Sequence, residues 1–463
     1  MSKTKDKHAK ERRGARAETP AQPGRRKFLA LGLGGLGTIA IAGIAGYKYS
    51  RLDSATSHSA ALPNLATGRP LPPVTLPADY RNALRAAEEI VSHYARELNN
   101  PSALIHGVRA FGKNFTLNDG SKTVDFLCSK FAVEKELNGK RYIYFPREAE
   151  VHDNSFLKTL LEAGVAPDQS ITAGGHQYRL RDLGESAQAL FRCDPQNLQR
   201  FDPSLVYQHL PWGLIAFSIL VPPSRPEWVN AYGETVKLPE VIDQGLAAFE
   251  NSCAGVREAI SEGHEEPLPF REEMAKYSCS GMHMAYGFFS CLKHGYRDHR
   301  LPERLQSIFD SLILRLQGDD EAIERESEAA RQLGQEYVNR MGIGQDGKNR
   351  ANGSPPPQTI EVMRLRHLVR ALGHALEAIN YARLHQLFNL TPEQTQRLQT
   401  GEQLIYRCMV QLRAMDLDVY LKWYGKFISD LVIAVAHAVR AMKLLTPNNP
   451  DTIAVNQSLG SRS

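Results

Sequence analysis

The chain has 463 residues, 42% of them hydrophobic and 23% charged, a composition typical of soluble globular proteins that bury a core. Its net charge of +5 is uneven: residues 1–46 carry ten Lys and Arg against three acids, which is +7 and leaves −2 for residues 47–463. Because the body has no basic excess, we expect no nucleic-acid binding through phosphate neutralisation.

The first 46 residues have the layout of an export signal. A basic region, residues 1–27, precedes an uncharged apolar run over residues 28–46. Such a run approaches the length of a membrane-spanning helix, and its basic flank favours retention on the cytoplasmic side. We expect a retained N-terminal anchor. The alternative is cleavage near Ala40-Ile41-Ala42, which would release a soluble periplasmic protein.

The segment Arg25-Arg26-Lys27-Phe28-Leu29 resembles the twin-arginine export signal, although Gly24 and Ala30 replace the usual hydroxyl residue and the frequent lysine. The resemblance implies export by the twin-arginine machinery. The body would then lie on the periplasmic side of the inner membrane, held through residues 28–46. Residues 47–77, rich in Pro, Ser and Ala, are expected to tether the anchor to the body.

Residues 78–205 predict a small α+β region. Two strand-like segments, 131–136 and 141–145, flank Asn138-Gly139, a pair that strongly favours a hairpin turn. A helix over 156–163 and a second short strand pair, near Ile171 and Tyr178, are expected to follow.

Residues 206–445 are expected to form a helical domain. Their apolar periodicity predicts helices over 210–220, 237–262, 280–294, 301–316, 319–340, 359–386, 392–413 and 417–445. Helices of this length joined by short turns pair as antiparallel hairpins. We therefore predict a mainly α fold, either a bundle or a closed ring of helical hairpins.

Three features of the C-terminal half complete the predicted organisation. The break at 342–358 indicates an exposed loop, and residues 446–463 are expected to form a flexible tail. Asp430, His437 and Arg440 interrupt the apolar face of the last helix. That helix is therefore predicted to pack on the body as an amphipathic helix and not to cross a membrane.

Two short motifs lie in the helical region. Ser278-Cys279-Ser280-Gly281-Met282-His283 opens one helix, and Gly373-His374-Ala375-Leu376-Glu377 lies within a later one. They resemble the Cys-Gly-Gly-x-His and Gly-His-x-Leu-Glu segments of α/α-toroid proteins related to terpenoid cyclases and prenyltransferases, with Ser280 in place of a glycine. The resemblance spans about residues 205–415. It implies an α/α toroid in which these residues face a central cavity.

The first motif provides two candidate metal ligands. Cys279 and His283 are four residues apart, so they project from one helix face, as paired ligands must. Zinc needs three or four donors, and the third would come from His374, or from His367, through the fold. No His-Glu-x-x-His or paired Cys-x-x-Cys accompanies them, so hydrogen bonding at a helix start and core packing is the alternative. The sequence does not identify a cofactor, and zinc is the metal ion whose binding should be tested.

The same motifs allow acid–base chemistry by His283, His374 and Glu377. Histidine titrates near neutrality, and a carboxylate three residues away can contact His374 on the helix. The alternative is a His–Glu pair on the protein surface. Two function classes stay open: an enzyme acting in a central cavity, or a non-catalytic envelope protein that binds a glycan or a peptide there.

Overall fold

The computed structural model describes residues 78–193, 205–262, 274, 276–334, 355–424 and 426–446. The predicted basic region, anchor and tether (1–77), most of the loop at 342–358 and the tail from residue 447 lie outside these residues. Among the helices of the described ranges, none is both long enough and apolar enough to span a membrane.

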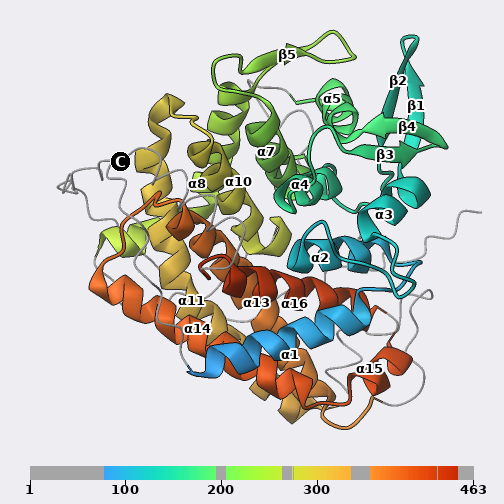
Figure 1. Ribbon diagram of the computed structural model, residues 1–463. Helices are drawn as coiled ribbons and strands as arrows, with labels where there is room; N and C mark the ends of the chain where they lie inside the picture. The colour runs from blue at the N-terminus through green and yellow to red at the C-terminus, as the bar shows by residue number, and fades with distance from the viewer. Residues whose placement is uncertain are drawn as a thin grey trace, which may run out of the picture. The chain divides into compact units, whose positions relative to one another are not determined.

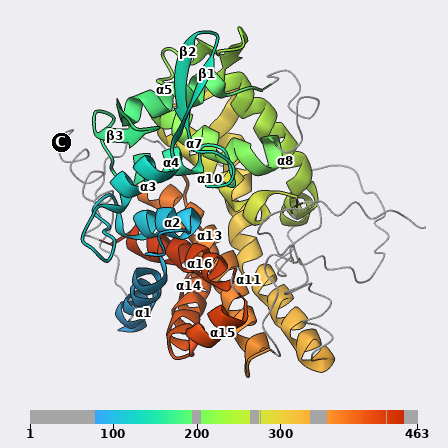
Figure 2. The same ribbon diagram turned by 90° about the vertical axis from the view of Figure 1, so that its right-hand side faces the viewer.

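The N-terminal part of the described chain combines short helices with two hairpins. Its elements are α1 (Ala78–Tyr94), α2 (Pro101–Phe111), α3 (Thr123–Phe131), β1 (Val133–Leu137), β2 (Lys140–Tyr144), α4 (Ser155–Glu162), β3 (Ser170–Ala173), β4 (His176–Arg179) and α5 (Leu180–Leu190). Both pairs, β1–β2 and β3–β4, are antiparallel, and the first turns at Asn138-Gly139 as predicted. Asn138 and Gly139 both have positive φ, the backbone that this turn requires. The hairpins lie beside α3 and α5 (Figures 1 and 2).

From residue 205 onward helices dominate, and the predicted mainly α class is confirmed. The elements are α7 (Leu210–Leu220), β5 (Glu227–Val229), β6 (Thr235–Lys237), α8 (Leu238–Ser261), α10 (Met282–Lys293), α11 (Leu301–Leu333), α13 (Thr359–Leu384), α14 (Pro392–Arg413), α15 (Leu417–Trp423) and α16 (Phe427–Lys443). The β5–β6 hairpin was not predicted. The closed toroid stays a prediction.

Two predicted helix boundaries were wrong. Separate helices were expected over 301–316 and 319–340, but α11 continues unbroken through Gly318, which is buried in the helix. Glycine weakens a helix interior by only about 1 kcal/mol relative to alanine, so packing can override it. Conversely, the helix expected over 417–445 is divided into α15 and α16.

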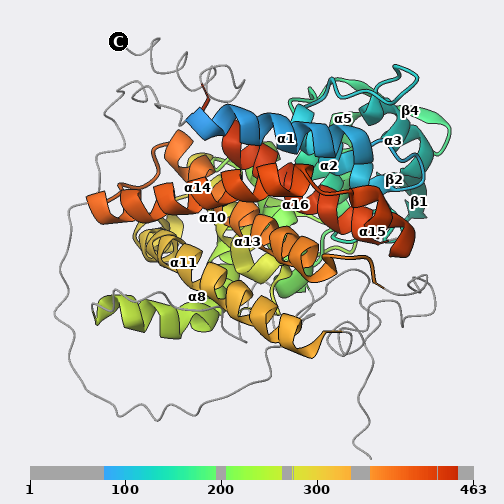
Figure 3. The same cartoon turned by 90° about the horizontal axis from the view of Figure 1, so that it is seen from below.

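Helix α13 lies at the centre of the helical part. Helices α10, α11, α14 and α16 pack against it, and Figure 3 shows α13 beside α11, α14 and α16. Most of its side chains are buried, as are those of α16. The last helix is therefore packed on the body, as predicted. Several polar residues of α13 and α16 are buried in the protein interior, where they need partners: His374, Glu377, Asn380, His437 and Arg440.

Candidate metal centre

The site begins at a tight turn before α10. Cys279 and Ser280 have left-handed backbone, with φ of 48° and 59°, and Gly281 follows with φ of 82°. Left-handed backbone costs a non-glycine residue roughly 1–3 kcal/mol, and such strain concentrates at functional sites. A Cβ on Gly281 would lie 2.5 Å from the Phe249 ring, so glycine is required there. The turn holds Cys279 at the start of α10.

Cys279, His283 and His374 converge at the contact between α10 and α13. The cysteine sulfur and one ring nitrogen of each histidine all lie within 4.8 Å of one another. His283 and His374 are 6% and 3% exposed, whereas Cys279 is partly accessible. Within the described ranges, no fourth Cys, His or carboxylate joins this set. His367 lies elsewhere on α13, with its Nε2 2.6 Å from Arg366 Nη2.

The hydrogen bonding of His374 fits a metal ligand. Its Nδ1 donates to the backbone carbonyl of Arg370 at 2.6 Å, so Nε2 carries the lone pair. Nε2 is buried and, apart from the neighbouring Cys279 sulfur, has no hydrogen-bond partner among the described residues. An unsatisfied buried polar atom costs about 1–3 kcal/mol. Metal-binding histidines usually donate one ring N–H to a carbonyl oxygen and bind the metal through the other ring nitrogen.

The protonation states of Cys279 and His283 also suit a metal. Burial by itself raises the pKa of the Cys279 thiol, but His374, Arg370 and His283 together hold it well below its ordinary value. Arg370 Nη2 lies 3.8 Å from the sulfur. Burial lowers the pKa of His283 to about 3, so its imidazole is neutral. Metal ions require a thiolate and neutral imidazoles.

Zinc is the ion that one thiolate and two imidazoles suit best. Zn–S and Zn–N bonds of about 2.3 and 2.0–2.1 Å place tetrahedral ligand atoms roughly 3.3–3.6 Å apart. The ligand atoms here lie within 4.8 Å of one another, so they would move closer together around a bound zinc ion. Trp212 covers one side of the site, its ring centroid 4.7 Å from that of His283.

Glu377, the remaining candidate catalytic residue, lies one turn beyond His374 but contacts other partners. Its carboxylate accepts hydrogen bonds from Arg109 and from Nδ1 of His437, and Arg440 Nε lies 3.0 Å away. In the described part of the chain it forms no hydrogen bond with His374. Glu377 is 1% exposed, so it belongs to a buried ion network and not to a surface pair.

Two residues near the centre were not recognised from the sequence as part of a site. The His437 ring stacks on His374, with centroids 3.7 Å apart, and Arg370 lies beside the Cys279 sulfur. His437 interrupts a stripe of buried Val and Ala on α16, a pattern that calls for a polar partner on the facing helix. Arg370 is four residues before His374 and so shares its helix face.

Gly373 allows α13 and α16 to approach closely. A Cβ on this residue would lie 3.1 Å from Ala438 N and 3.2 Å from Ala434 O, both backbone atoms of α16. Backbone atoms cannot rotate out of the way as the end of a side chain can. Any side chain at Gly373 would therefore push the helices apart and move His437 away from His374.

We expect Gly373→Ala to lower the free energy of unfolding by about 1–3 kcal/mol, the usual cost of overpacking a core. Urea denaturation measures the change. Gly401→Ala is the matched control, because its added Cβ would meet the Leu316 side chain at 3.6 Å, an ordinary contact. Alanine is favoured over glycine in a helix by up to about 1 kcal/mol, so this control should be neutral or stabilising. Equal losses in both variants would contradict the proposed close contact.

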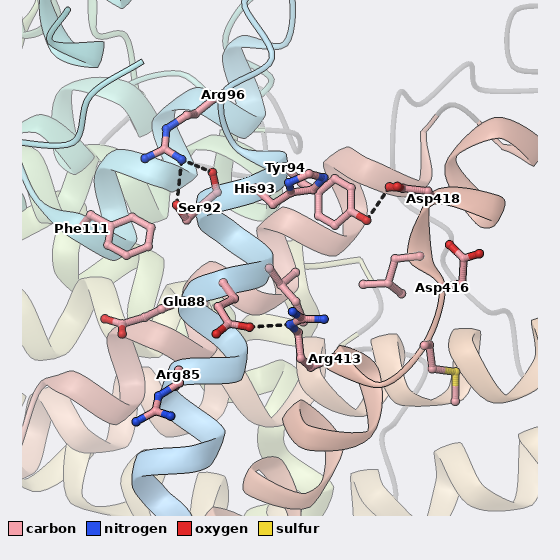
Figure 4. A pocket seen from close by; sticks show the side chains of 14 residues that line it. Arg85, Glu88, Ser92, His93, Tyr94, Arg96, Phe111, Arg413, Asp416 and Asp418 are labelled. Atoms are coloured by element: carbon pink, nitrogen blue, oxygen red, sulfur yellow. Dashed lines mark hydrogen bonds and ion pairs between the residues drawn. The ribbon is translucent and has the colours of Figure 1, made fainter. Parts of the chain in front are cut away.

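Two pockets in the described part of the chain lie away from this centre. One of about 730 Å³ is bordered by α1, α14 and α15 (Figure 4). Its polar groups pair with each other: Tyr94 donates to Asp418 at 2.7 Å, and Arg413 lies 2.5 Å from Glu89. Another, of about 370 Å³, lies among β2, α4 and α5. Neither is lined by a candidate metal ligand.

No protein-family model, characterised protein or solved structure matches this chain. The function has to be inferred from the geometry of the residues themselves.

Proposed function

We propose that the chain is a zinc-dependent enzyme whose metal is held by Cys279, His283 and His374, with the fourth position open to water or substrate. The convergence of these three donors within 4.8 Å carries the proposal, and the buried Nε2 of His374, which has no neighbouring partner besides the Cys279 sulfur among the described residues, supports it. Catalytic zinc typically has three protein ligands, whereas structural zinc has four. Bound zinc would lower the pKa of a coordinated water to about 7 and so supply a nucleophile for hydrolysis or hydration.

We further infer that the enzyme works on the periplasmic side of the inner membrane. The twin-arginine segment and the apolar run over 28–46 support export with a retained anchor; a cleaved, soluble periplasmic form is the alternative. Peptides and glycans of the cell envelope would be available to the enzyme there as substrates. Cell fractionation tests the location, and replacing Arg25 and Arg26 by lysine should leave the chain in the cytoplasm.

The metal content of the purified full chain tests the enzyme assignment. We expect one zinc per chain after reconstitution, measured by mass spectrometry of the elements. Cobalt(II) in place of zinc should give a thiolate charge-transfer band and the visible absorption of a four-coordinate site. Cys279 is partly exposed while the other cysteines are buried, so zinc should protect it from iodoacetamide. A reconstituted chain without bound metal would overturn the zinc assignment.

A metal-free thiol enzyme is the second candidate, favoured by the contact between Arg370 and the Cys279 sulfur and by the strained backbone of Cys279. A thiolate beside a histidine is a nucleophile for acyl transfer. In that case alkylation of Cys279 would abolish activity, whereas chelators would have no effect. A chain with neither bound metal nor a reactive thiol would fit the predicted alternative, a non-catalytic envelope binding protein.

A further inference from the structure

We propose that the zinc centre accepts a substrate bearing an anionic group, a carboxylate or a phosphate, and that Arg370 binds this group. The inference rests on the proposed function, because it requires a metal ion at Cys279, His283 and His374.

Arg370 lies beside the metal centre and has N–H donors available for a ligand. It is half-buried on α13, one turn before His374, with Nη2 3.8 Å from the Cys279 sulfur. Among the described residues, it forms no ion pair with a carboxylate. A guanidinium has five N–H donors in a planar fork, and the sulfur engages one of its nitrogens. The remaining donors can therefore serve a ligand.

Two neighbouring arginines, Arg366 beside Arg370 and Arg315 beside Ser280, already pair with carboxylates. Arg366 Nη1 lies 2.8 Å from Asp430, the acid that also influences Arg370 electrostatically. Arg315 bonds Asp319 at 3.1 Å and the carbonyl oxygen of Ser280 at 3.2 Å. Within the described ranges, Arg370 is thus the arginine beside this turn whose partner is the Cys279 sulfur and not a carboxylate.

A metal ion bound through the Cys279 sulfur would place further positive charge beside Arg370, whose Nη2 lies 3.8 Å from that sulfur. Zn²⁺ with one thiolate and two neutral imidazoles carries a net charge of +1, by simple addition, and Arg370 then adds a second uncompensated positive charge beside it. A half-buried cation next to a cationic centre is costly unless an anion joins them.

A carboxylate or a phosphate would meet both requirements. One of its oxygens could occupy the open metal position while the others accept hydrogen bonds from the guanidinium, whose fork matches these anions in bidentate fashion. A neutral substrate group would leave both positive charges uncompensated. The open position is therefore built for an anion.

The test uses the full chain loaded with cobalt(II), titrated separately with acetate and with inorganic phosphate. We expect a saturable change in the visible cobalt spectrum and a matching calorimetric affinity. Arg370→Gln should weaken that affinity by about 10- to 100-fold with the cobalt content unchanged. The anion affinity of Arg370→Lys, which keeps the charge but loses the planar fork of donors, should lie between those of the parent and of Arg370→Gln. Arg331→Gln, an exposed arginine of α11, is the control and should have no effect.

Each outcome is decisive. A response to acetate alone assigns a carboxylate substrate, a response to phosphate alone assigns a phosphate substrate, and either supports the inference. A chain that holds cobalt but responds to neither anion overturns the inference and leaves the metal assignment standing. Anion affinity unchanged in both Arg370 variants overturns the role of Arg370. A chain that takes up no cobalt overturns the metal assignment, and the inference with it.

Discussion

Cys279→Ser, His283→Ala and His374→Ala should each lower the affinity for zinc by at least about 100-fold, the upper end of the loss seen when a residue that only hydrogen-bonds a metal ligand is replaced. Each change leaves two protein donors, and two donors are fewer than zinc sites in proteins use. Competition with a coloured chelator measures the affinity. Because bound zinc stabilises the native state by mass action, chelation should lower the Tm of the parent chain and leave that of Cys279→Ser unchanged.

Two control variants separate the ligands from their neighbours. Cys291→Ser removes a buried thiol of the same helix, α10, whose sulfur lies 3.8 Å from the Leu214 carbonyl oxygen. His106→Gln removes an imidazole whose ring centroid lies 5.5 Å from that of His437, outside the ligand set. Both should bind zinc as tightly as the parent. If Cys279→Ser also did so, the metal would lie elsewhere in the chain.

The two sequence motifs predicted part of this centre, because each contains a candidate metal ligand and a glycine that the local backbone requires. Gly281 permits the left-handed turn that presents Cys279, and Gly373 permits the close approach of α16 beside His374. The spacing predicted that Cys279 and His283 share one helix face, but Cys279 lies in the left-handed turn before α10 and only His283 is on the helix. That these two meet His374 depends on the packing of α10 against α13, which spacing along the chain does not encode.

The partners of Glu377 show why the rest could not be predicted. The helix spacing suggested a contact with His374, but the carboxylate is engaged by Arg109 from α2 and His437 from α16. These residues are far from Glu377 in sequence and have no periodic relation to it. The sequence does place charged residues on helix faces that are otherwise apolar. Such residues indicate a buried ion network, but they do not show which of them pair.

Glu377 belongs to a buried ion network that joins four helices. It pairs with Arg109 of α2 and Arg440 of α16. Arg109 also lies 2.9 Å from Glu162 of α4, which in turn pairs with Lys158 at 2.8 Å. Three cations thus face two carboxylates in the core. Each carboxylate is shared, so the loss of either one leaves three cations facing a single carboxylate.

We expect Glu377→Gln to lower the free energy of unfolding by about 3–5 kcal/mol, the cost of breaking a buried ion pair from one side. Urea denaturation measures the loss. Because Glu377 contacts none of the metal ligands through a hydrogen bond, the folded fraction should still bind one zinc per chain. A variant with parent stability and lost activity would instead assign Glu377 to the chemistry, as the sequence suggested.

Lys158→Met tests whether the stability lost in Glu377→Gln comes from the imbalance of charge or from the loss of hydrogen bonds within the network. Lys158 is as deeply buried as Glu377, and burial together with Arg109 lowers its pKa to about 7, so near neutral pH it already gives up much of its charge. Methionine fills a similar space and removes the excess cation, so we expect stability within about 1 kcal/mol of the parent. If Lys158→Met cost as much as Glu377→Gln, the hydrogen bonds to Glu162, and not the balance of charge, would hold the four helices together.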